Sequence, residues 1–112
     1  MSQDVEDFLR ECRELIAQRK VTINPKKDAK RRRIETLDKL EYNIQAMLEE
    51  IKELSPIDLR SGPEPDHVFP DEVVWIFKKL IKGYLIYIKI KIRQIPIGKD
   101  LYVKSFHLDM YW

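Results

Sequence analysis

The sequence contains only one cysteine, Cys12, and only three glycines in 112 residues. A single cysteine excludes an internal disulfide and fits a reducing cytoplasm. With so few glycines, the chain has no glycine-rich loop of the kind that cradles phosphates. Its two histidines are far apart and form no cluster with metal-ligand spacing, so we expect no metal site and no cofactor.

Long hydrophobic stretches are also missing. No segment approaches the roughly 20 apolar residues that cross a bilayer, and the acidic first residues do not resemble a signal peptide. We therefore expect a cytoplasmic protein without a membrane partner. At 44% hydrophobic and 36% charged residues, the chain is typical of one soluble globular domain over residues 1–112. Abundant Lys and Glu beside few Asn, Gln and Gly suggest a thermophilic source.

Charge is distributed unevenly along the chain. Residues 1–72 contain 13 Lys and Arg against 17 Asp and Glu, a net charge of −4. Residues 73–112 contain 8 against 2, a net charge of +6. A basic C-terminal part on a nearly neutral protein indicates a localised anionic partner, although lysines on an exposed strand also serve solubility.

Residues 1–55 are predicted to be helical. The first helix should end near Lys20, with Ser2 or Asp4 as its N-cap and Cys12 on its buried face. Residues 21–23 form a short β-prone stretch. Apolar spacing predicts a short helix over 34–40 and another over about 43–54.

That basic run reads KKDAKRRR over Lys26–Arg33. We interpret it as a solvated loop or the start of a helix, with a phosphate-binding patch as the alternative. Residues 56–72 are expected to form a loop, because Ser61–Asp71 contains three prolines and one glycine.

Residues 73–112 are predicted to form an antiparallel sheet. Between Tyr84 and Ile95 the residues alternate strictly, so one side has isoleucines and the other has four polar residues, Tyr87, Lys89, Lys91 and Arg93. The fold class is therefore α+β, with the N-terminal helices packed on the isoleucine face of a small antiparallel sheet. The other face should remain open.

The open face is predicted to bind RNA. Alternate residues of a strand lie about 7 Å apart, close to the spacing of phosphates in a single strand. The candidate RNA-binding residues are Lys89, Lys91, Arg93 and Lys104, with Tyr87 as a stacking surface.

His107 is the candidate acid or base, because imidazole titrates near neutrality. Strict alternation groups His107 with Leu101 and Val103, and if those two point inward His107 becomes a structural histidine. A bulge or a frayed strand end would instead turn it outward.

Five short segments carry a resemblance to a known family. They are Glu53–Asp58 (ELSPID), Ser61–His67 (SGPEPDH), Val74-Trp75, Ile86–Ile90 (IYIKI) and Lys104–His107 (KSFH). In this order they resemble the MqsR (motility quorum-sensing regulator) family of toxins from type II toxin–antitoxin systems. The resemblance extends from about Phe8 to His107.

The resemblance implies a RelE-like fold and a ribosome-independent mRNA interferase with a cognate antitoxin. The family's strand tyrosine falls on Tyr87 and its catalytic lysine on His107. Another family lysine has no clear equivalent, and Arg60 or Ser61 is nearest to it. A family glutamine falls on Ile76, which cannot do the same chemistry. The implied catalytic residues are thus His107, Tyr87 and Arg60.

For metal-independent RNA cleavage, our hypothesis is that Arg60, Lys89 and Lys91 hold the phosphate and His107 acts as acid. Tyr87 orients the substrate or assists the base, since a neutral phenol is a poor base. Glu64 and Asp66 are candidates for that base, or are ordinary polar loop residues.

Two alternatives remain, of which the first uses the same row of cations. The first is a noncatalytic RNA-binding module. The second is a degenerate family member retained for protein interaction, either antitoxin binding or homodimerisation through the sheet edge.

Overall fold

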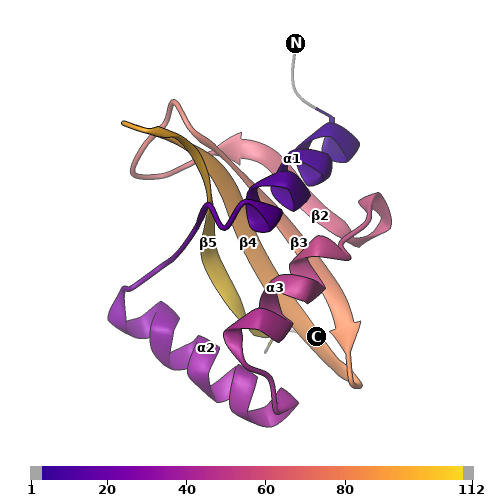
Figure 1. Cartoon of the computed structure of the whole chain (residues 1–112). Coiled ribbons are helices and arrows are strands. Elements are labelled where there is room, and N and C mark those ends of the chain that lie inside the picture. Colours follow the sequence, from indigo (N-terminus) through magenta and orange to yellow (C-terminus); the bar gives the residue numbers. More distant parts are fainter. Residues whose placement is uncertain (1–3, 110–112) are drawn as a thin grey trace.

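The computed structural model describes residues 4–109, in which three α-helices pack against a five-stranded mixed sheet (Figure 1). The α+β fold class is confirmed. The helices are α1 (Val5–Ala17), α2 (Lys27–Leu40) and α3 (Ile44–Lys52). The strands are β1 (Val21–Ile23), β2 (Leu59–Pro65), β3 (Val73–Ile81), β4 (Tyr84–Ile95) and β5 (Gly98–Leu108). None of these helices is both long enough and apolar enough to span a membrane.

The strand order is β1-β5-β4-β3-β2, with β1 parallel to β5 and all other neighbours antiparallel. The antiparallel sheet predicted from Val73 onward is thus present as β3, β4 and β5, although residues 110–112 lie outside the described part. The β-prone stretch 21–23 adds a parallel edge strand. The sheet is therefore mixed rather than purely antiparallel.

The expectation of a loop over all of residues 56–72 was wrong. Residues 59–65 form β2, which pairs with β3 through two register shifts. This strand lies at the edge of the sheet, where prolines are tolerated because their missing N–H groups are not needed by a second neighbour. The remainder of the segment, residues 66–72, does connect β2 to β3 without a strand or helix.

Helices α1 and α3 begin and end close to their predicted limits, whereas α2 begins at Lys27, well before the predicted start at residue 34. The side chain of Asp4 caps α1 by accepting a hydrogen bond from the Asp7 amide at 2.8 Å, and Ser2 lies outside the described residues. The helix ends at Ala17, one turn earlier than predicted. The basic run Lys26–Arg33 is a helix start, since α2 begins at Lys27.

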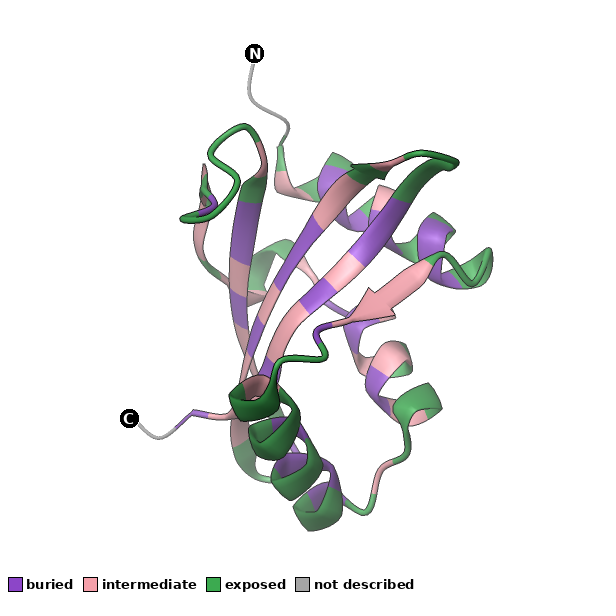
Figure 2. Ribbon diagram, turned by 90° about the vertical axis from the view of Figure 1, so that its left-hand side faces the viewer, coloured by how far each residue is buried: buried purple, intermediate pink, exposed green. Residues whose placement is uncertain are grey.

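The core lies between the isoleucine face of the sheet and the helices α1 and α3, which cross that face (Figure 1). Phe8 of α1 stacks on Trp75 of β3 with ring centroids 4.7 Å apart. Cys12 is fully buried, as predicted, and burial raises the pKa of its thiol. Figure 2 shows the alternation of buried and partly exposed residues along the long strands.

A β-bulge in β5 changes which side chains face the core. Ser105 pairs with Lys89 and Val103 with Ile90, so Lys104 is an extra residue between the two pairs. Before the bulge, Val103 is fully buried in the core; after it, Phe106 is the next residue in the core, at 1% exposure.

The same bulge decides the orientation that the sequence left open. His107 pairs with Tyr87 across β4 and β5, and their rings stack on the open face. The outward orientation is therefore produced by a bulge and not by fraying of the strand end.

Asn24, just after β1, holds this bulge. Its amide nitrogen Nδ2 donates to the carbonyl of Lys104 at 3.1 Å, and its backbone N–H donates to the carbonyl of Val103 at 3.0 Å. The buried Arg33 of α2 in turn donates to the Asn24 carbonyl at 3.1 Å. One asparagine thus connects the bulge, β1 and α2.

Replacing Asn24 by alanine should therefore lower the free energy of unfolding by about 2 kcal/mol, because the Lys104 carbonyl loses its donor. Urea denaturation measures this loss. The control is Asn43→Ala, which removes the exposed N-cap of α3 and should cost about 1 kcal/mol. An Asn24→Ala variant no less stable than this control would contradict the assignment.

Candidate active site

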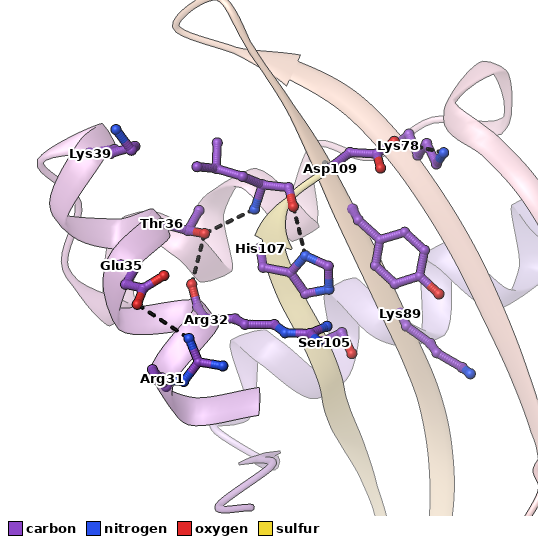
Figure 3. Close-up of a pocket in the computed structure, with 12 residues that line it drawn as sticks. Arg31, Arg32, Glu35, Thr36, Lys39, Lys78, Lys89, Ser105, His107 and Asp109 are labelled. Atoms are coloured by element: carbon purple, nitrogen blue, oxygen red, sulfur yellow. Dashed lines mark hydrogen bonds and ion pairs between the residues drawn. The ribbon is translucent and has the colours of Figure 1, made fainter. Parts of the chain in front are cut away.

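A cleft of about 610 Å³ lies between α2 and the open face of the sheet (Figure 3). Its walls come from α2 on one side and from β3, β4 and β5 on the other. The lining residues are Arg31, Arg32, Glu35, Thr36, Lys39, Lys78, Tyr87, Lys89, Ser105, His107, Leu108 and Asp109. Tyr87 and His107, two of the three predicted catalytic residues, both line it.

Tyr87 and His107 are stacked, with ring centroids 5.0 Å apart and planes inclined by 17°. Burial raises the pKa of the Tyr87 hydroxyl, and the carboxylates of Glu64 and Asp109 raise it further. The phenol is therefore neutral at physiological pH and cannot act as an efficient base. An orienting or hydrogen-bonding role fits it better.

His107 has a defined proton position. Its Nδ1 lies 2.8 Å from the carbonyl oxygen of Leu108 (Figure 3). Because a carbonyl oxygen only accepts, Nδ1 carries a proton and donates it. The other ring nitrogen, Nε2, then remains available for a ligand.

The charge of the cleft is positive, since five of its lining residues are Lys or Arg and two are Asp or Glu. Arg31 pairs with Glu35 at 3.5 Å, and Lys78 with Asp109 at 2.7 Å. The three other cations, Arg32, Lys39 and Lys89, form no ion pair with any of residues 4–109.

Arg32 is a cation of α2 that extends into the cleft. In Figure 3 its side chain extends from α2 toward the strand that bears Ser105 and His107. An anionic ligand on the stacked rings would therefore lie between cations of α2 and Lys89 of β4.

Lys91 was predicted to be exposed on the open face, and this prediction was wrong. It is 2% exposed, and its Nζ lies 2.9 Å from Asp66 Oδ2 and 2.7 Å from Glu72 Oε1. Residues 66–72 fold over this part of the open face, with the ring of Phe69 5.1 Å from the ammonium group. Burial alone would lower the pKa of Lys91, but the two carboxylates raise it above its ordinary value.

Arg93 and Lys104 do not line the cleft either. Arg93 makes a bidentate pair with Asp100 at 2.9 and 2.7 Å and stacks on Tyr102 at 4.3 Å. Lys104 donates to Asp66 Oδ2 at 2.8 Å. Of the four predicted RNA-binding residues, the structure thus brings only Lys89 to the stacked rings.

The two carboxylates considered as a base lie outside the cleft. The side chain of Asp66 is 0% exposed. Burial alone would raise its pKa, but hydrogen bonds from Lys104, Lys91 and two backbone amides lower it well below the ordinary range. Glu64 accepts a hydrogen bond from the Ser61 hydroxyl at 2.6 Å. Asp66 is therefore a structural anion.

Arg60, the third predicted catalytic residue, is exposed in β2 at the far edge of the sheet. Its guanidinium donates to the carbonyls of Ile57 and Leu59, both at 3.3 Å, and it does not line the cleft. The structure therefore brings Tyr87 and His107 together but leaves Arg60 apart from them.

Sequence reasoning missed Arg31, Arg32 and Lys39 as site residues. The basic run that includes the first two was visible, and the phosphate-binding patch was considered as the alternative for it. The signal was insufficient because the sequence does not say where α2 packs. Its contact with β5 places the run beside His107.

No protein-family model matches the chain, and no curated protein matches it. The resemblance to MqsR toxins thus stays a prediction from short motifs. The functional argument depends on the cleft itself.

The buried pair of Lys91 and Asp66 predicts a pH-dependent loss of stability in Asp66→Asn. At pH 7 this change should cost about 3 kcal/mol, because Lys91 loses one of its two anionic partners. The folded-state pKa of Asp66 is lowered, so its contribution is complete above the ordinary aspartate pKa of about 4 and declines as the pH falls below it.

The difference in unfolding free energy between wild type and Asp66→Asn in urea denaturation should therefore stay constant from pH 7 to about pH 4 and narrow below that pH. The matched control is Asp71→Asn, an exposed residue of the same segment, which should change stability by less than about 0.5 kcal/mol. Equal losses in the two variants would be inconsistent with a structural role for Asp66.

Proposed function

We propose that the protein is a metal-independent RNA endonuclease, an MqsR-like and RelE-like toxin of a type II toxin–antitoxin system. The observation that supports this most is the stack of His107 on Tyr87 in a cleft lined by five cations. It joins an imidazole, a side chain that can donate or accept a proton, with charges that attract phosphate.

The chemistry favours RNA over DNA as the substrate. The nucleophile that we assign in this metal-independent mechanism is the 2′-hydroxyl, which RNA has and DNA lacks. The 2′-oxygen attacks the phosphorus while its proton passes to a solvent base. The bond from phosphorus to the 5′-oxygen breaks, which leaves a cyclic phosphate and a free 5′-hydroxyl.

His107 serves as the acid in this proposal. Since Nδ1 is bonded to the Leu108 carbonyl, the proton for the leaving 5′-oxygen comes from Nε2 of the imidazolium. Arg32 and Lys89 stabilise the additional negative charge on the phosphorane. The neutral Tyr87 hydroxyl donates a hydrogen bond to the substrate.

An antitoxin is the proposed protein partner. A cleft with this charge would be blocked by an acidic segment laid between α2 and the sheet. The motifs shared with MqsR toxins and the helices packed on one sheet face support this assignment.

A second candidate is a noncatalytic RNA-binding module. Ile76 supports it, because it lies opposite Lys89 in the β3–β4 pairing where a polar family residue is expected. In that case the stacked rings of Tyr87 and His107 would serve only as a platform for a base.

Cleavage assays separate these functions. We expect purified protein to cleave single-stranded RNA in EDTA and to leave products that end in a cyclic phosphate or its hydrolysed form. His107→Ala should slow cleavage at least about 100-fold while RNA binding is retained, because it removes the acid.

The control is His67→Ala, which changes the other histidine, an exposed residue outside the cleft. Failure of the wild type to cleave any RNA, with or without ribosomes, would refute the nuclease. Salt-dependent RNA binding without cleavage would select the RNA-binding module. If the protein does not bind RNA at all, protein interaction remains as its function.

The two arginines predict different salt dependences of RNA binding. Arg32→Ala should weaken binding and reduce the slope of log K against log salt by about 0.7, the loss of one phosphate contact. Arg60→Ala should change neither quantity, because Arg60 lies outside the cleft. Equal effects of the two variants would mean that Arg60 also contacts the RNA, contrary to its position outside the cleft.

A further inference from the structure

Thr36 connects α2 to the end of β5 through a single hydroxyl. Its residue is 1% exposed, and its Oγ1 donates to the carbonyl of Arg32 at 2.8 Å. The same oxygen accepts a hydrogen bond from the backbone N–H of Leu108 at 2.9 Å. The bond to Arg32, four residues earlier, is common for threonine in helices, whereas the second bond is specific to this fold.

The Leu108 residue links Thr36 to the imidazole of His107. Its N–H is held by Thr36, and its carbonyl accepts the Nδ1 proton of His107 at 2.8 Å. Figure 3 shows these bonds as a continuous series from α2 to the ring.

The outer edge of β5 explains why this series is needed. β1 pairs with β5 only over Leu101–Val103, so no strand within residues 4–109 covers the outer edge beyond Val103. Side chains take the place of that strand. Asn24 bonds the Lys104 carbonyl, and Thr36 bonds the Leu108 amide.

We propose that Thr36 is a positioning residue for His107. By fixing the Leu108 backbone, it directs a carbonyl at Nδ1, keeps the proton on that nitrogen and leaves Nε2 facing the cleft. This role rests on the proposed nuclease function, whereas the position of the ring proton is a property of the protein alone. Thr36 touches no reacting atom, so its effect on the reaction is transmitted through Leu108.

Without the hydroxyl, the Leu108 N–H loses the acceptor that holds it, and the Leu108 carbonyl is free to turn. Imidazole then loses the acceptor that selects between its two neutral forms. Partners that orient a histidine in this way typically change its performance 10–100-fold in metal sites, and we expect about 10-fold here.

The decisive variant is Thr36→Val, which keeps the shape of the side chain and removes the hydroxyl. Thr36→Ser restores the hydroxyl. The control is Thr22→Val, which removes the hydroxyl that donates to Asp100 at 2.6 Å, outside the cleft.

The first measurement is ¹⁵N NMR of the imidazoles at about pH 8.5, two units above the ordinary histidine pKa. The chain has two histidines, so His67→Ala assigns the spectrum. Wild type, Thr22→Val and Thr36→Ser should hold the neutral His107 proton on Nδ1. Thr36→Val should show a mixture of the two forms.

The second measurement is RNA cleavage. Thr36→Val should lower kcat about 10-fold with little change in KM, and Thr36→Ser should recover most of the loss. Thr22→Val should match wild type. If Thr36→Val does not fold, Thr36→Ala replaces it in both measurements. The position of the His107 ring proton in the wild type then still tests the role of Thr36.

The two measurements test the positioning role of Thr36 and the nuclease function separately. A wild-type proton on Nε2, or a Thr36→Val variant equal to Thr22→Val in both measurements, would overturn the role of Thr36 alone. A wild type that cleaves no RNA would refute the nuclease, and the positioning role with it, even if the proton resides on Nδ1.

Discussion

One extra residue in β5, Lys104, determines which chemistry the open face can have. With strict alternation, His107 would follow Leu101 and Val103 into the core. The bulge instead places the side chains of Lys104 and Ser105 on the same face, so that Lys104 bonds Asp66 and Ser105 lines the cleft. His107 then lies against Tyr87, its partner across the strand pair. The stacked pair therefore depends on an irregularity, and Asn24 holds that irregularity.

Burial, and not position along the chain, determines which cations of the open face are available to a ligand. Lys89 and Lys91 are two residues apart on one strand, yet Lys89 lines the cleft and Lys91 is enclosed by Asp66 and Glu72. Burying an ammonium group costs several kcal/mol, so two carboxylates and an aromatic ring surround it. Residues 1–72 thus supply the carboxylates that neutralise Lys91 and Lys104. The same residues 1–72, although acidic overall, also contain the cations of α2 that line the cleft. The net charges of residues 1–72 and 73–112 therefore did not indicate where the positive cleft lies.

Local patterns predicted the elements, and tertiary contacts decided the site. The alternation in Tyr84–Ile95 and the helical spacing of the first 55 residues were sufficient for the α+β fold and for the isoleucine core. Prolines concealed the edge strand β2, because they fit an edge strand and a loop equally well. The bulge at Lys104 has no local sequence signal. The enclosure of Lys91 and the packing of α2 beside His107 both join residues far apart in the chain, which periodicity cannot detect.

The proposed mechanism has one protein group for proton transfer. More of the rate enhancement must therefore come from electrostatic stabilisation of the transition state. His107 cannot be acid and base in the same step, and Asp66 is buried in ion pairs. A positioned acid contributes about 10²–10⁴ in rate, and each donor that stabilises the transition state about 10²–10³. The cations of α2 therefore matter as much as the imidazole. Their distance from it is set where α2 meets β5, through Arg33 on Asn24 and Thr36 on Leu108. In the proposed mechanism, cleavage therefore depends on the contact between α2 and β5 as well as on His107.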